Sequence, residues 1–167
     1  KNKPEKQQRN QTGSPILEEG DILLNTTLAE TNDWQQVDLP VVRTLRHFCI
    51  ETLSSYTEDN QACISEVDLL DDKGQPIDKT KWEVVYISSE QADKNLGVAE
   101  NLFDGDISSF WHTDPATEPG QPHRIIVDIK EIYKISALRF KVRKGVFLSG
   151  KVKEINVYGR PQFFLFH

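Results

Sequence analysis

The chain has 167 residues, a net charge of −6 and a sequence pI of about 5.2. A nucleic-acid-binding surface needs clustered positive charge to neutralise phosphates, so this balance excludes a general nucleic-acid binder. The same acidity argues against attachment to an anionic membrane, and no apolar run reaches the roughly eighteen residues that membrane insertion requires.

The first part of the chain is predicted to lie outside the folded domain. Residues 1–15 are rich in Lys, Gln, Asn and Pro and contain no large apolar side chain, so we expect a disordered tail or linker. Residues 16–33 are a mixed lead-in that could add one strand. Residues 34–167 are predicted to form a single β-sandwich domain.

From Asp21 onwards, short runs of β-branched and aromatic residues alternate with turn residues, which is typical of strands joined by turns. Pro40 is expected to end one of these runs. No window keeps helical periodicity over three turns, although residues 90–101 could hold a helical turn. The expected strands are residues 21–24, 34–39, 43–54, 62–70, 82–88, 124–129, 135–142 and 152–158. This spacing predicts an all-β sandwich or barrel.

Two cysteines and three tryptophans add constraints on the core. Cys49 and Cys63 lie in expected strands, and they could form one disulfide or remain two buried thiols. We favour the thiols, because two cysteines do not make a disulfide framework and no CxxC pair is present for a zinc site. Trp82 and Trp111 are expected in the core. The apolar segment 163–166 could pack on the sandwich or continue into a longer protein.

The segment from residue 99 to residue 113, AENLFDGDISSFWHT, is the most informative part of the sequence. It is followed by Pro122-His123, Val127-Asp128-Ile129, Tyr133-Lys134-Ile135-Ser136, Leu138-Arg139-Phe140 and Gly150-Lys151-Val152-Lys153-Glu154-Ile155. The order and spacing of these motifs over residues 34–160 resemble the F5/8 type C (discoidin) domain family, and family 32 carbohydrate-binding modules in particular. The resemblance implies an all-β jelly-roll β-sandwich of the galactose-binding-domain-like type.

The resemblance also implies a structural Ca²⁺ ion near the Asp-Gly-Asp loop. Calcium takes six to eight oxygen ligands and mixes carboxylates with backbone carbonyls. We expect Asp104 and Glu154 to bind through their side chains, and Leu102, Asp106 and Ser109 largely through backbone oxygens. Without a metal, Asp104 would instead cap the loop as an Asx-turn.

A sugar site is the second implication of the resemblance. Relatives that bind galactose use a Glu, a His and an Arg, because sugar hydroxyls need both hydrogen-bond acceptors and donors. These residues match Glu90, His112 and Arg143 in this chain. Those relatives often carry an aromatic residue three positions after the His, where this chain has Pro115, so Phe147 is the candidate stacking ring. Each residue also has a plainer interpretation. Glu90 could cap a turn, and His112 could bond within a loop. Arg143 could be solvated, and Phe147 could fold under its loop.

No catalytic signature is present: the sequence has no GxSxG, HExxH, Walker loop or dinucleotide-binding glycine pattern. The predicted function is therefore a non-catalytic, extracytoplasmic carbohydrate-binding module. We expect it to belong to a larger, secreted bacterial glycan-processing enzyme and to bind galactose-like sugars without inserting into a membrane. The alternatives are a protein-interaction or adhesion module, or a structural spacer, of the same fold.

Overall fold

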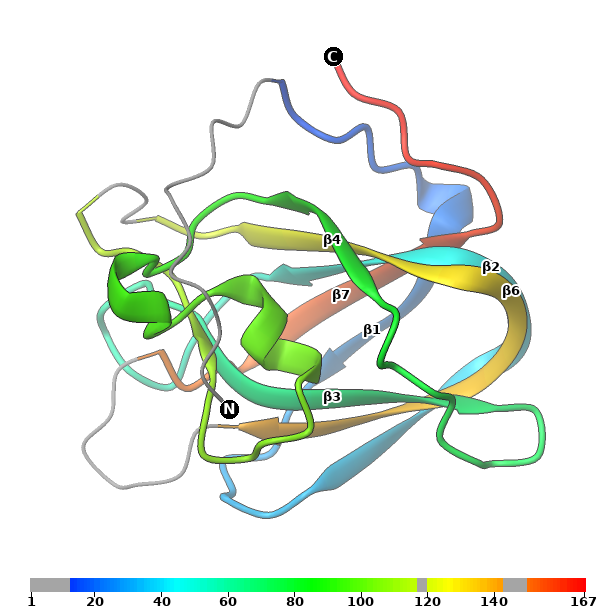
Figure 1. Ribbon diagram of the computed structural model, residues 1–167, viewed down its shortest axis with the longest axis horizontal. Helices are drawn as coiled ribbons and strands as arrows, with labels where there is room; N and C mark the ends of the chain where they lie inside the picture. Colours follow the sequence, from blue (N-terminus) through cyan, green and yellow to red (C-terminus); the bar gives the residue numbers. More distant parts are fainter. Residues whose placement is uncertain (1–12, 117–119, 143–149) are drawn as a thin grey trace.

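The computed structural model describes residues 13–116, 120–142 and 150–167, and its long elements are all β-strands (Figure 1). Three short 3₁₀ helices accompany them: η1 (Glu19–Asp21), η2 (Asp93–Asn95) and η3 (Ala99–Phe103). The strands are β1 (Ile22–Thr27), β2 (Gln35–Thr52), β3 (Cys63–Asp71), β4 (Glu83–Ile87), β5 (Trp111–His112), β6 (His123–Val142) and β7 (Glu154–Arg160).

All the strand pairings are antiparallel, in the order β1-β7-β2-β6-β3-β5, with β4 also paired to β6. The first half of β2 pairs with the last half of β6. On its other edge, that half of β6 pairs with β3, which pairs with β5. The last half of β2 pairs with β7 and with the first half of β6, and that half of β6 pairs with β4 on its other edge. The sheet therefore folds over on itself into two layers, and the predicted β-sandwich is confirmed.

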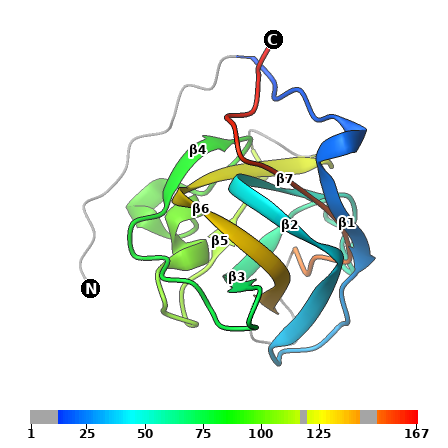
Figure 2. The ribbon, with the colours of Figure 1, turned by 90° about the vertical axis from the view of Figure 1, so that its right-hand side faces the viewer.

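Two reciprocal bulges make this fold-over possible. Residues 39–42 of β2 lie opposite Ser136 alone, and residues 129–132 of β6 lie opposite Arg46 alone. Bulges bend strands and increase their twist. Pro40 lies in the first bulge, where no ladder bond needs its missing N–H, and Lys130 in the second adopts a left-handed φ of 74°. Both strands curve together at one side of the molecule (Figure 1), and Figure 2 views the molecule from that side.

The strand predictions need three corrections. The runs 34–39 and 43–54 form one strand, β2, and the runs 124–129 and 135–142 form one strand, β6, because the breaks between them are bulges. β5 was not predicted. The helical turn expected within residues 90–101 is present as the 3₁₀ helices η2 and η3. No helix in the described part of the chain is long and apolar enough to cross a membrane.

The main core lies between the two layers of the sandwich. Trp82 and Trp111 are buried in it, as predicted, together with Phe48. Strict alternation would place Leu45 on the same face as Cys49, but the register shift after Leu45 turns its side chain into the core. Cys49 and Cys63 are both buried thiols.

A second, smaller cluster covers the outer face of the layer that contains β2 and β7. Cys49, Tyr86 and Ile126 pack there against Phe164 from the chain's C-terminal segment. The N-terminal segment pairs beside it, since the Ile16 amide donates to the Leu165 carbonyl at 2.7 Å. The segment 163–166 therefore packs on the sandwich. Residues 1–12 of the expected tail lie outside the described residues, and the lead-in 16–33 contains β1, which pairs with β7.

Candidate functional site

Two backbone hydrogen bonds join the loop after β4 to β5, and a third closes that loop, at the end of the sandwich opposite the β2–β6 bend (Figure 1). The Gln91 amide donates to the His112 carbonyl at 2.8 Å, the His112 amide donates to Gly97 at 3.1 Å, and the Gly97 amide donates to Gln91 at 2.8 Å. A Cβ on Gly97 would lie 3.0 Å from the His112 Cβ and 3.1 Å from the Gln91 Cβ. Glycine therefore permits this close approach, which brings Glu90 and His112 to neighbouring positions.

Both of these side chains are almost fully enclosed: Glu90 is 1% exposed and His112 is 3% exposed. Glu90 Oε1 accepts a hydrogen bond from the Ala99 amide at 3.0 Å, at the first residue of η3. His112 Nδ1 lies 2.5 Å from the Thr113 carbonyl oxygen. Because a carbonyl only accepts, Nδ1 carries the proton, and Nε2 of a neutral ring is then an acceptor. Both side chains are therefore held by backbone groups at this end of the sandwich.

The Asp-Gly-Asp loop gathers oxygen atoms around one hydroxyl group. Ser109 Oγ donates to Asp104 Oδ2 at 2.5 Å and lies 3.0 Å from the Asp106 carbonyl oxygen. Asp104 Oδ1 accepts from the Asp106 amide at 2.9 Å, and Gly105 between them has a left-handed φ of 78°. Asp104 therefore caps the loop as an Asx-turn, the arrangement expected without a metal. The loop oxygens are also of the kind that a hard cation such as calcium prefers.

The other residues expected around calcium lie as follows. Leu102 is buried in η3. Glu154 is the first residue of β7. Its amide donates a hydrogen bond to Ser54 Oγ at 3.2 Å, and its carbonyl oxygen accepts one from the Leu53 amide at 2.8 Å. Within residues 13–116, 120–142 and 150–167, no three His, Cys, Asp or Glu side chains are grouped as metal ligands. A calcium site here would therefore depend on the backbone and serine oxygens of the loop.

Glu66, on β3, is an acid that supports this loop and was not predicted from the sequence. Both of its carboxylate oxygens accept from the Gly105 amide, at 3.2 and 3.1 Å, and Lys79 forms an ion pair with it. Burial raises the pKa of Glu66 to about 7, against the opposing effects of Lys79 and the Gly105 amide. The signal in the sequence was that Glu66 lies among the apolar residues of an expected strand, residues 62–70.

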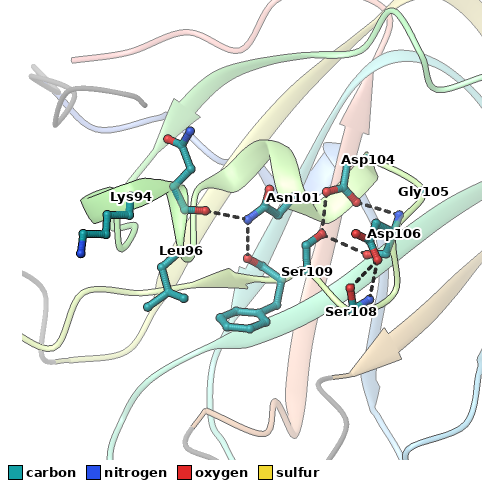
Figure 3. Close-up of a pocket in the computed structure, with 10 residues that line it drawn as sticks. Lys94, Leu96, Asn101, Asp104, Gly105, Asp106, Ser108 and Ser109 are labelled. Carbon is teal, nitrogen blue, oxygen red and sulfur yellow. Dashed lines mark hydrogen bonds between the residues drawn. The ribbon is translucent and has the colours of Figure 1, made fainter. Parts of the chain in front are cut away.

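A pocket of about 740 Å³ lies between this loop and η2 (Figure 3). Lys94 and Leu96 stand on one side, and Asp104 and Ser108 stand on the other. The buried Asn101 joins the two sides, because its Nδ2 donates to the Asn95 carbonyl at 3.2 Å and to the Phe110 carbonyl at 3.0 Å.

The sequence of this end of the sandwich matches a known family: residues 85–162 match the family model of the F5/8 type C domain. That stretch of the chain is similar to F5/8 type C domains. The "Sialidase" of Micromonospora viridifaciens is 36% identical over 71 residues, which are 41% of this chain and 11% of that protein. The chain thus corresponds to a small part of that relative.

The four residues expected at the sugar site divide into two groups. Glu90 and His112 are brought together and are enclosed. Arg143 and Phe147 lie outside the described residues. The pocket walls at Lys94, Leu96 and Phe110 were not predicted, although an apolar Leu96 between Asn95 and Gly97 is unusual for a polar loop.

Proposed function

We propose that this domain is a non-catalytic carbohydrate-binding module, similar to family 32 modules, that binds galactose-like sugars at the loop end of the sandwich. The observation that supports it best is the adjacency of Glu90 and His112. These residues, which the resemblance assigns to one sugar site, sit on segments joined by the 2.8 Å hydrogen bond between Gln91 and His112.

The chemistry of the four residues suits a sugar. The Glu90 carboxylate and the His112 Nε2 accept hydrogen bonds from hydroxyl groups, and the Arg143 guanidinium donates them in a fixed fork. The Phe147 ring is of the kind that stacks on the apolar C–H face of a sugar. The four residue types together would supply acceptors, donors and one stacking ring.

Binding should be tested by calorimetric titration with galactose, N-acetylgalactosamine and fucose. Arg143→Ala should weaken the affinity about tenfold or more, since a charge-assisted hydrogen bond contributes roughly 1.5–3 kcal/mol. His112→Ala should do the same, with circular dichroism to verify folding because this side chain is buried. Lys73→Ala, an exposed change in the turn after β3, is the matched control and should bind as the wild type does.

The alternatives predict other outcomes of the same experiments. Glycan-independent binding to a protein or lipid surface that is lost in Phe147→Ala would indicate an adhesion module. The absence of binding to any ligand would indicate a structural spacer.

A structural calcium ion is part of this proposal. Asp104, Asp106 and Ser109 would hold it, with Leu102 and Glu154 as the further expected ligands, and its role would be to fix the loop. Calcium chloride should then raise the melting temperature by several degrees relative to EDTA, because a ligand that binds only the native state stabilises it. Asp104→Asn should remove this difference, and Asp72→Asn, exposed in a distant turn, should keep it. A wild-type melting temperature that is indifferent to calcium would contradict the metal site.

We further propose that the domain serves a secreted, extracytoplasmic multidomain enzyme by holding it near its glycan substrate. The similarity to part of a larger sialidase supports this role. Weak binding at one site is sufficient, because tethering raises the effective concentration of substrate at the catalytic domain. The isolated chain should release no sugar from aryl galactosides or sialyllactose in a chromogenic or chromatographic assay, and measurable release would contradict the non-catalytic role.

A further inference from the structure

The pocket beside β5 is a separate concave surface from the enclosed Glu90–His112 pair. Its walls are residues 94–96 and the loop 104–110, and neither Glu90 nor His112 lines it (Figure 3). Its volume of about 740 Å³ lies within the roughly 300–1,000 Å³ that small-molecule sites occupy. The resemblance assigns no sugar-binding residue to its Lys94–Leu96 wall.

This wall is held in place before any ligand arrives. Asn101 is buried, and it ties Asn95 to Phe110 through two hydrogen bonds. The wall ends at Gly97, which is packed against His112. Lys94 and Asn95 both have left-handed backbones, with φ values of 51° and 57°. A site fixed in this way loses little conformational entropy on binding.

The composition of the pocket matches a sugar ring. Leu96 is 57% exposed and, with the half-buried Phe110, forms an apolar surface for a C–H face. Lys94 donates hydrogen bonds, and Ser108 can both donate and accept them. The lining carries one cationic side chain, Lys94, and two carboxylates, Asp104 and Asp106, which the calcium ion proposed above would also bind. Its net charge is therefore small with or without that ion, which suits a neutral sugar.

The pocket wall at Phe110 lies next to the proposed sugar site. Phe110 comes directly before β5, which contains His112. Their ring centroids lie 6.4 Å apart in an edge-to-face arrangement. A sugar unit that packs on Phe110 would therefore lie close to His112.

We propose that this pocket is a second saccharide subsite, in which Leu96 and Phe110 pack against a neutral sugar unit adjoining the one at Glu90 and His112. The inference rests on the proposed function and extends it, since the domain then recognises an oligosaccharide rather than a single sugar. Phe110 also supplies an aromatic ring close to His112 in a chain that has Pro115 at the position where galactose-binding relatives often have one.

The test compares galactose with lactose, a neutral disaccharide, by calorimetric titration of the full chain. Lactose should bind wild type about tenfold more tightly than galactose, which corresponds to about 1.4 kcal/mol. Leu96→Ala should remove most of this advantage and leave galactose affinity unchanged, and Lys94→Ala should reduce it. Ile132→Ala is the matched control, because Ile132 is 63% exposed at the distant β6 bulge, and it should keep the advantage.

The possible results distinguish failure of the second subsite from failure of the proposed galactose-binding function. Equal affinities for lactose and galactose in the wild type would overturn the second subsite and leave the first in place. A lactose advantage that survives in Leu96→Ala would also overturn it, because the second sugar unit would then be held elsewhere. If neither sugar binds, the proposed function fails and the subsite fails with it.

Discussion

Asn101 holds together the two sides of the pocket with a single side-chain amide. Replacing it with alanine would leave the Asn95 and Phe110 carbonyls without this donor. We expect Asn101→Ala to lower the free energy of unfolding by about 1–3 kcal/mol, because two hydrogen bonds of a buried side chain are lost. Urea denaturation, monitored by tryptophan fluorescence, measures this free energy in the variant and the wild type.

Asn25 gives a matched comparison for this change. Its Nδ2 also has two acceptors, the Ile155 carbonyl at 3.2 Å and Asn156 Oδ1 at 2.9 Å, but the residue is exposed on β1. Asn25→Ala should cost no more than about 0.5 kcal/mol, as exposed substitutions usually do. Equal losses for the two variants would show that Asn101 is no more important than a surface amide.

The Asp128 carboxylate near the β6 bulge makes stability depend on pH. Burial raises its pKa, but hydrogen bonds from the Arg46 side chain and the Lys130 amide, with the charges of His47 and Arg46, outweigh burial and bring the pKa below its ordinary value of 3.8. Arg46 Nε and Nη2 donate at 2.9 and 3.1 Å, and the Lys130 amide donates at 2.7 Å. Since the folded pKa is the lower one, this stabilisation is complete above 3.8 and is lost as pH falls through the folded value.

Asp128→Asn should therefore destabilise the chain by about 1.5–3 kcal/mol at neutral pH, the range for hydrogen bonds to charged groups. The difference from wild type should narrow in urea titrations as pH falls below 3.8. Asp72→Asn, exposed in the turn after β3, should show no such loss. A loss that does not change with pH would mean that the carboxylate charge has no part in it.

Motif order was enough to pair Glu90 with His112, because the spacing of residues along the chain is preserved in the resemblance. Their enclosure could not be predicted, because it depends on how closely Gly97 packs against His112. The contact between Glu66 and the Asp-Gly-Asp loop could not be predicted either. The partner of Glu66, Gly105, is distant in sequence and contributes only a backbone amide.

The bend in β2 and β6 is what converts one sheet into a sandwich. Sequence patterns located both strands but broke each of them in two, because Pro40 and the polar residues after Ile129 resemble strand ends. The bulges there interrupt pairing without ending the strands. β5 escaped prediction because two residues are too few to show alternation.

Gly159 on β7 permits the close approach of two leucines from the neighbouring strands β1 and β2. A Cβ there would lie 2.8 Å from Leu23 Cδ1 and 2.9 Å from Leu45 Cδ2, and both leucines are buried. Gly159→Ala should destabilise the domain by about 1–3 kcal/mol through overpacking. Gly20→Ala, where no atom lies within 4 Å of the new Cβ, should be close to neutral in the same thermal unfolding assay. Similar melting temperatures for both variants would contradict this packing argument.

The sandwich as a unit separates its structural and binding regions. The bend closes one end, the two terminal segments cover the outer face of one layer, and the loops around η2, η3 and β5 occupy the opposite end (Figure 1). Loops positioned on a rigid scaffold are where binding residues usually lie. This arrangement leaves the loop end as the surface that a glycan would meet.

The central claim is that this loop end binds a galactose-like sugar, and amide chemical-shift mapping by NMR tests it most directly. Galactose is titrated into the ¹⁵N-labelled chain in the presence of calcium. We expect saturable shifts at the amides of Gln91, Gly97 and His112, and none at Val41 or Ile132 in the bulges. An absence of shifts with galactose, N-acetylgalactosamine and fucose, or shifts confined to the bulges, would contradict it.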